Sequence, residues 1–178
     1  FTQPGGPGTA GFTSNLGKAR IRGIEAGASF NPMSGLALGA SVSLMDPKLL
    51  TDSPGLGAFA GDRLPNSPKS AAAITSRYSF DLAGRPAFAG LNLTYQGNRN
   101  SSFENSTLVP NYALPSFTQF DLASGVKFEN FDIGVYVRNL TNVRGQLGAT
   151  TGEQATTGRT YVHVIDPRTI GVNLAATF

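Results

Sequence analysis

The chain has 178 residues, of which only 14% are charged; its formal net charge is +3, and it contains no cysteine and no tryptophan. Soluble domains usually carry about 25% charged residues, so something other than charge covers the outer surface of this protein. The small, scattered positive charge argues against nucleic-acid binding, the lack of cysteine excludes disulfides and thiolate metal sites, and no apolar run approaches the ~18 residues of a membrane-spanning helix.

Seven segments alternate apolar and polar residues with a period of two, and clusters of turn residues separate them. The last segment shows the pattern well, because Ile170, Val172 and Leu174 alternate with small polar or glycine residues up to the terminal Phe178. The predicted strands lie near 20–31, 36–45, 70–82, 87–97, 116–128, 131–139 and 169–178.

The connections between these segments alternate in length. Three are tight turns rich in Gly, Pro and Asn, at 31–35, 83–86 and 129–130. The other three are long and polar, at 46–69, 98–115 and 140–168. Short turns at one end and long loops at the other are typical of a transmembrane β-barrel, with the turns in the periplasm and the loops outside the cell. Residues 1–15 are then expected to form an extracellular loop.

Phenylalanines gather where the predicted strands meet the tight turns, as in an aromatic girdle at a membrane interface. The six are Phe30, Phe80, Phe88, Phe128, Phe131 and Phe178. Phe88 alone lies on the polar side of its strand, and a β-bulge at Gly90 would return it to the apolar side.

Charged residues within the strands mostly fall on the side opposite the apolar residues, where they would face the barrel lumen. This set is Glu25, Arg77, Asp81, Asp121, Lys127, Asp132 and Arg138. Arg20 and Arg22 are the exceptions, because they share the parity of Ile24. A bulge at Gly23 would re-aim them, and contact with anionic lipid phosphates is the alternative; the bulge is the preferred interpretation.

A soluble β-sandwich would also alternate apolar and polar residues. It would not predict uncharged outer faces on all seven strands together with aromatics at one end. We therefore predict an all-β fold, an antiparallel transmembrane β-barrel. Because bacterial barrels have even strand numbers and lipid tolerates no open edge, further strands are expected to precede Phe1, and the chain is expected to be part of a longer protein.

Five motifs give the sequence a resemblance to the C-terminal part of TonB-dependent outer-membrane receptors. They are Gly23-Ile24-Glu25, the segment 61–69 (GDRLPNSPK), Leu114-Pro115-Ser116-Phe117 with Asp121-Leu122, the segment 137–142 (VRNLTN), and 167–171 (PRTIG) with the terminal Phe178. The resemblance implies a barrel of about 22 strands around a plug, of which this chain supplies the last seven, while the plug and the earlier strands lie outside it.

The same resemblance implies a function in the cell outer membrane. Such receptors import scarce nutrients such as siderophore-bound iron or oligosaccharides, and they are energised through TonB by contacts in the N-terminal part. The expected partners are the TonB complex, the receptor's own plug, the barrel assembly machinery, lipopolysaccharide or other outer-membrane lipid, and a small-molecule ligand.

Candidate ligand-binding residues lie toward the outer end of the predicted lumen and in the outer loops, where amides, aromatics and cations could engage a solute. They are Gln96, Arg99, Tyr112, Gln119, Tyr136 and Arg138. Val172, Leu174 and Phe178 resemble the C-terminal signal that outer-membrane proteins present to the assembly machinery, and Phe178 also fits a simple interface anchor.

No catalytic, cofactor or metal site is predicted. His163 is the only histidine, and no carboxylate lies at metal-ligand spacing from it. No Ser-His-Asp arrangement can be assembled around it. Two alternatives to a transporter remain: a non-transporting adhesin or structural barrel, and, less favoured, a barrel phospholipase.

Overall fold

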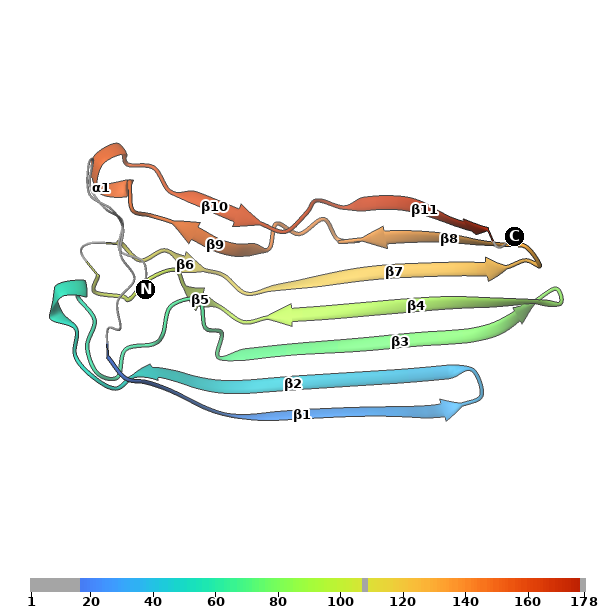
Figure 1. The fold of residues 1–178 in the computed structure, drawn as a ribbon, viewed down its shortest axis with the longest axis horizontal. Helices are drawn as coiled ribbons and strands as arrows, with labels where there is room; N and C mark the ends of the chain where they lie inside the picture. The colour runs from blue at the N-terminus through green and yellow to red at the C-terminus, as the bar shows by residue number, and fades with distance from the viewer. Residues whose placement is uncertain (1–16, 107–108, 177–178) are drawn as a thin grey trace.

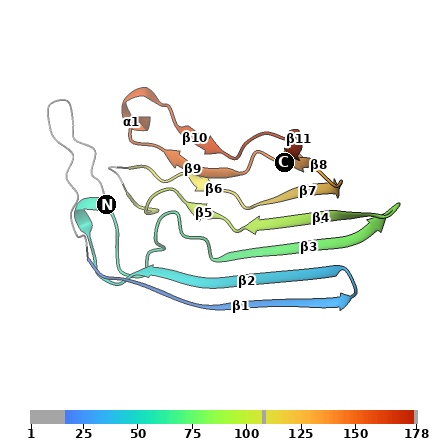
Figure 2. The same ribbon diagram turned by 45° about the vertical axis from the view of Figure 1, so that its right-hand side comes forward.

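The computed structural model describes residues 17–106 and 109–176, whose main element is one extended seven-stranded antiparallel sheet. The strands lie side by side in a single layer (Figure 1), and the view turned by 45° shows the same order (Figure 2). The seven strands are, in order, β1 (Ala19–Met33), β2 (Leu36–Leu49), β3 (Ser70–Leu82), β4 (Arg85–Gln96), β7 (Phe117–Lys127), β8 (Phe131–Arg138) and β11 (Thr169–Ala176). The predicted all-β antiparallel fold is confirmed.

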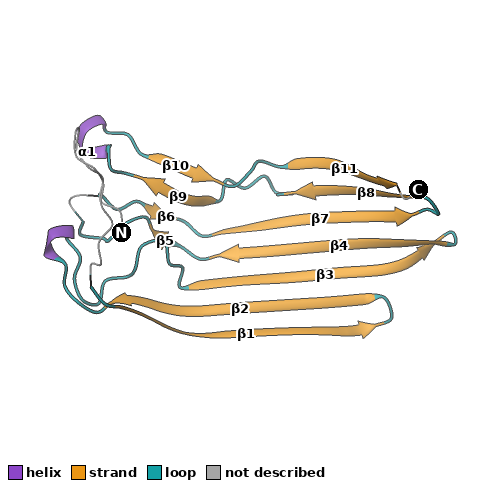
Figure 3. Cartoon of the chain, viewed as in Figure 1, coloured by secondary structure: helices purple, strands orange, loops and turns teal. Residues whose placement is uncertain are grey.

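Smaller elements extend the long loops, which gather at the end of the sheet opposite the tight turns (Figure 3). Two short ladders pair β5 (Arg99–Asn100) with β6 (Ala113–Leu114) and β9 (Gln146–Thr150) with β10 (Tyr161–Val164). A single helical turn, α1 (Gln154–Thr157), lies between β9 and β10, and a 3-10 turn spans Pro54–Leu56. Among the described residues, no helix is long and apolar enough to cross a membrane.

The turn between β3 and β4 shows how local sequence sets the hairpins. Ala83 and Gly84 both have positive φ, of 54° and 80°. Two such residues form the tight loop whose twist matches that of the flanking strands. The Gly84 amide also donates to Asp81 Oδ1 at 2.6 Å, which closes the turn.

The register makes each face of the sheet continuous from β1 to β11, because residues directly opposite each other in an antiparallel ladder point to the same side. Ile24 opposes Leu44, for example, and Val135 opposes Val172. We call this side the outward face: its side chains include Ile24, Val42, Ile74, Leu93, Leu122, Val135 and Val172. The other side, the lumen face, carries all seven charged strand residues expected there.

The sheet has no hydrophobic core of its own in the described part of the chain. Large outward side chains remain exposed, with Ile24 at 72% and Val172 at 65%. The described core cluster lies instead in the loop region, where Leu49, Leu56, Ala58 and Phe103 pack together with Leu64. An apolar face of this extent requires an apolar environment, which hydrocarbon supplies.

The structure contains neither the bulge predicted at Gly23 nor the bulge considered at Gly90. Pairing of β1 with β2 is continuous from Ala19 to Phe30, so there is no bulge at Gly23, and Arg20 and Arg22 stay on the outward face. The only irregularity of this pair lies between Phe30 and Met33.

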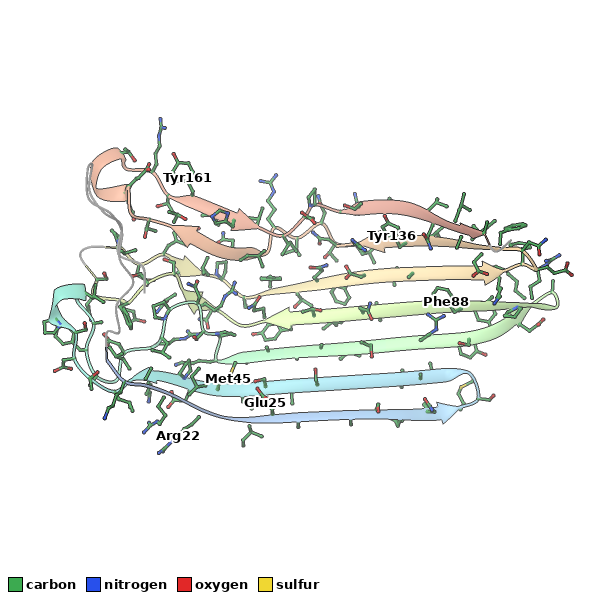
Figure 4. The ribbon with its side chains drawn as sticks, viewed as in Figure 1. Arg22, Glu25, Met45, Phe88, Tyr136 and Tyr161 are labelled. Atoms are coloured by element: carbon green, nitrogen blue, oxygen red, sulfur yellow. The ribbon has the colours of Figure 1, made fainter. Side chains whose placement is uncertain are left out.

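Gly90 is also in continuous register on both sides, so Phe88 faces the lumen (labelled in Figure 4). Its ring packs where a side chain at Gly125 would stand, and the Arg77 guanidinium lies 3.7 Å from the ring centroid. Phe88 is therefore accommodated on the lumen face by a glycine and a cation, and no bulge is needed.

Strand β2 runs to Leu49, four residues past the predicted end at Met45. Asp46-Pro47-Lys48 looks like a turn in sequence, yet these residues pair with Arg22, Ile21 and Arg20. Pro47 lacks an amide hydrogen but its carbonyl accepts from the Leu64 amide at 3.1 Å, so the segment after the 3-10 turn lies along this end of β2.

The facing of β11 predicts unequal effects of arginine at neighbouring positions. Val172→Arg in the complete barrel should cost about 2 to 4 kcal/mol of folding free energy, because a cation would enter the hydrocarbon near its midplane. Asn173→Arg, on the lumen face, should be far milder. Denaturant titration of the complete barrel in lipid vesicles measures both, and equal tolerance at the two sites would contradict the assigned facing.

Candidate functional site

The outer end of the lumen face brings several predicted residues together on β4, β7 and β8. Gln96 opposes Phe117, Gln119 opposes Thr94, and Tyr136 opposes Ala123. Gln96 and Gln119 thus lie diagonally across one strand pair, within reach of a common solute. The structure places these two amides on one wall of the lumen below the long loops.

Tyr136 and Arg138 form the second part of this wall. The Tyr136 ring packs over Gly171 of β11, where any side chain would collide with it, and the Arg138 guanidinium lies 5.2 Å from the ring centroid. Figure 4 labels Tyr136 on β8. The ring is thereby fixed flat against the sheet, with an exposed cation beside it. An aromatic face next to a guanidinium suits a ligand that is both planar and oxygen-rich.

Asp121 connects this wall to the start of the long loop after β8. Its Oδ1 accepts from Gln119 Nε2 at 2.8 Å and from the Asn139 amide at 2.8 Å. Gln119 is therefore oriented by a carboxylate rather than left free to rotate. Among the lumen-facing charges of the described strands, none forms an ion pair, so cross-strand ion pairing does not account for them.

Asn139 has a role that the sequence did not reveal. It is 1% exposed, and its Nδ2 donates to the carbonyls of Val143 and Asp166, each at 2.9 Å, while its Oδ1 accepts from the Val143 amide at 3.0 Å. Its φ of +50° suits asparagine better than most residues. One side chain thus joins the two ends of the loop between β8 and β11.

Asn142 and Arg168 complete this junction. Asn142, also at positive φ, accepts from the Arg168 amide at 3.0 Å, and Arg168 Nη1 donates to Leu140 at 3.4 Å. The signal in the sequence was the Asn-Leu-Thr-Asn run immediately after a strand, because asparagine tolerates the left-handed conformation that such a junction needs.

Arg99 lies in the loops, on β5, and is 5% exposed. Its Nη2 donates to the Gln146 carbonyl of β9 at 2.5 Å, so the guanidinium links two loops. Burial lowers the pKa of Arg99, and the neighbouring Arg63 cation lowers that pKa further. Its Nε and Gln146 Oε1 are buried without a hydrogen-bond partner in the described part of the chain.

Arg63, in the 61–69 segment, organises the adjacent loop. Its Nε and Nη2 donate to the Ser67 carbonyl at 3.1 and 2.8 Å, and Nη2 also donates to the Asn98 carbonyl. Burial lowers the pKa of Arg63, while Glu104 opposes that effect. Both arginines are thus held by backbone carbonyls.

Tyr112 lies in the same loop region. Its backbone exchanges hydrogen bonds with Ser101, whose amide donates to the Tyr112 carbonyl at 3.0 Å and whose Oγ accepts from the Tyr112 amide at 2.9 Å. Tyr112 is half-buried and directly precedes β6, which pairs with the strand that carries Arg99, so it lies in the loop region rather than on β4, β7 or β8. Ligand contact by any of the six predicted residues stays a prediction.

The predicted assembly signal lies at the opposite, tight-turn end. Val172 and Leu174 point outward from β11 and are exposed. Phe178 lies outside the described residues. The described residues hold no group of three or more histidine or acidic side chains arranged to bind a metal ion.

An apolar outward face, a polar lumen face, tight turns and long ordered loops define the wall of an outer-membrane β-barrel. Residues 1–140 match the family model "TonB dependent receptor-like, beta-barrel", and the chain belongs to this family. Its strands cross the outer membrane several times as part of a multi-pass β-barrel. No curated protein sequence gives a match.

Solved structures similar to this chain are uptake receptors of the same fold. The ferric yersiniabactin uptake receptor FyuA of Yersinia pestis aligns over 90% of this chain and 24% of its own, with 21% identity and a TM-score of 0.75. The siderophore receptor PiuA of Acinetobacter baumannii aligns over 90% and 22%, with 20% identity and a TM-score of 0.69.

The ferric-catecholate import receptor Fiu of Escherichia coli K12 aligns over 97% of this chain and 22% of its own, with 17% identity and a TM-score of 0.69. The chain therefore spans about a quarter of the length of these receptors and corresponds to a partial barrel.

Removal of the Asn139 side chain should loosen the loop between β8 and β11. Asn139→Ala leaves the Val143 and Asp166 groups unpaired and places alanine at positive φ, so local stability should fall by about 2 kcal/mol. Hydrogen exchange of the Val143 amide in the complete receptor measures this change. Asn173→Ala, at an exposed asparagine of β11, is the control, and equal protection in both variants would contradict the role of Asn139.

Proposed function

We propose that this chain is the C-terminal wall of a TonB-energised receptor that imports a scarce nutrient, with a ferric siderophore as the preferred cargo and an oligosaccharide as the second choice. The observation that carries the proposal is membership of the receptor family together with a barrel wall whose solved neighbours are siderophore uptake receptors. The remaining support comes from the chemistry of the lumen and loops.

The wall formed by Gln96, Gln119, Tyr136 and Arg138 is suited to an oxygen-rich chelate. The amides donate hydrogen bonds, the guanidinium supplies positive charge without a competing ion pair, and the fixed ring of Tyr136 offers a flat contact. A catecholate or hydroxamate chelate presents negative oxygens and planar groups, so its chemistry is complementary. A neutral saccharide would use the amides and the ring but would gain little from Arg138.

Arg99 and Tyr112 would act in the loop layer above this wall. The buried Arg99 supports the loops between β4 and β7 and between β8 and β11 through its bond to Gln146. We assign it to loop positioning, with direct ligand contact possible only after the loops move. In this proposal the ligand is captured by the loops and then passed to the lumen wall.

Energy for release of the ligand would come from TonB acting on a plug held inside the complete barrel. Lumen charges without an ion pair among the described residues, such as Arg77, Asp121 and Asp132, would form polar contacts with that plug. Insertion into the outer membrane would depend on the assembly machinery, with Val172 and Leu174 offering the outward apolar pattern and Phe178 the terminal aromatic.

The test is uptake by the complete receptor in an iron-limited host that lacks its own receptors. A panel of radiolabelled ferric catecholates, hydroxamates and mixed chelates is supplied with and without functional TonB. Uptake of at least one chelate should require both the receptor and TonB. Uptake of a labelled oligosaccharide instead would make an oligosaccharide the imported ligand. The absence of TonB-dependent uptake of both classes would overturn the proposal.

Arg138→Ala should lower the affinity for the transported chelate about tenfold or more, because a charge-assisted hydrogen bond to an anionic ligand is lost. Arg85→Ala removes an exposed arginine at the tight-turn end of β4, away from the loops, and is the matched control. Binding to the purified receptor at equal protein level measures both variants. Unchanged affinity in Arg138→Ala would remove this residue from the site without affecting the transport test.

A further inference from the structure

The outward face carries a group of cations at the loop end of β1 and β2. Because the register is continuous, Arg20 opposes Lys48 and Arg22 opposes Asp46 on the same side of the sheet as Ile24 and Leu44. We call Arg20, Arg22 and Lys48 the outward cation cluster. Figure 4 labels Arg22 on β1, between the loops and the long apolar part of the strand.

The cluster lies at the expected height of the outer membrane boundary. Phe30, near the tight turn, and Arg20 are ten residues apart on β1. At a rise of about 3.4 Å per residue and a strand tilt of about 40°, this separation corresponds to roughly 26 Å along the membrane normal, close to the ~25 Å height of the apolar band of outer-membrane barrels.

An inversion of polarity supports the same boundary. From Ile24 to Phe30 the outward side chains are apolar and the lumen side is polar, with Glu25 accepting from Ser43 at 3.2 Å. At the next pairs toward the loops, the outward side chains are charged, while the buried Leu49 and Pro47 on the other side join or adjoin the core cluster of the loops. The sheet thus leaves the hydrocarbon between Ile24 and Arg22.

The cluster has an excess of positive charge. Asp46 forms an ion pair with Lys48 at 3.1 Å, and both side chains are partly exposed. Neither arginine forms an ion pair with another described residue, and Arg20 Nε is buried without a hydrogen-bond partner. Guanidinium groups at a lipid boundary match phosphate in charge and in bidentate geometry.

We propose that Arg20, Arg22 and Lys48 form a binding site for the phosphate groups of an outer-leaflet lipid, namely lipopolysaccharide. The acyl chains would lie along the outward face directly below, where Ala26, Ala28 and Ala40 make the surface shallow between Ile24 and Phe30. The long arginine side chains extend toward the headgroups while their stems stay in contact with the acyl chains. This site is independent of the imported ligand, because it faces away from the lumen.

The test measures binding of lipopolysaccharide to the complete receptor, purified in detergent and stripped of lipid. The triple variant Arg20→Gln/Arg22→Gln/Lys48→Gln should bind at least about tenfold more weakly than the unmodified receptor, because each cation near an anionic lipid surface contributes about fivefold. Arg144→Gln/Arg159→Gln removes two exposed cations of the loop between β8 and β11 and should bind within about twofold of the unmodified receptor, because those cations lie outside the cluster.

Two further arms make the result decisive. Dephosphorylated lipopolysaccharide should lose most of the affinity of the unmodified receptor. The charge-conserving Arg20→Lys/Arg22→Lys variant should bind more tightly than the triple variant, which separates loss of charge from misfolding. Equal binding by the triple and control variants, or equal binding of the dephosphorylated lipid, would overturn the proposal. Competition by inorganic phosphate at millimolar concentration would assign the cluster to free phosphate and would also overturn the lipid assignment.

Discussion

Backbone hydrogen bonding is the constraint on which the rest of this structure depends. Hydrocarbon offers no partner for an amide or a carbonyl, so a strand within it must pair on both sides. Here the inner strands β2, β3, β4, β7 and β8 each pair with two neighbours. Strands β1 and β11 have one neighbour each in this chain, and their other edges are satisfied in lipid only as part of the larger barrel to which the fold corresponds.

Because the ladder is continuous, successive residues of each strand face opposite sides of the sheet. This alternation alone determines which side chains face lipid and which face the lumen. The outward face can be apolar because lipid covers it, and the lumen face can hold charges without ion pairs because water or a plug covers it. Glycines, rather than bulges, then make room for bulky side chains on the sheet. Gly125 and Gly171 make room for Phe88 and Tyr136, so bulky rings lie flat on the lumen wall without any break in pairing.

This explains what the sequence could and could not predict. Alternation identified the seven strands because period two directly reflects the two faces of a sheet. The predicted bulge at Gly23 was wrong, and the bulge considered at Gly90 is absent, because each rested only on one or two residues of unexpected parity, whereas the ladder is stabilised by all its neighbours. No bulge is needed at either place, because Arg20 and Arg22 reach the lipid headgroups from the outward face and Phe88 packs over Gly125 on the lumen face.

The loops were predicted less well, for a different reason. The hairpin of β9 and β10 is short and lies within a Gly- and Thr-rich stretch, so no periodic signal distinguishes it. Gln96, Gln119, Tyr136 and Arg138 could be placed by parity, but the burial of Arg99 depends on Gln146, a contact 47 residues away in the chain. Likewise, the Asn-Leu-Thr-Asn run marks a turn after β8, but the hydrogen bond from Asn139 to Asp166 spans 27 residues and is recognisable only in the fold.

The Asn139 junction has a consequence for how this protein can change over evolution. Because one side chain joins both ends of the loop between β8 and β11, a change in length beyond this junction leaves the junction itself in place. Lengthening such a segment costs only a logarithmic entropy term. The tip of this loop can therefore accept insertions, new epitopes or altered capture surfaces while the membrane-embedded wall stays unchanged.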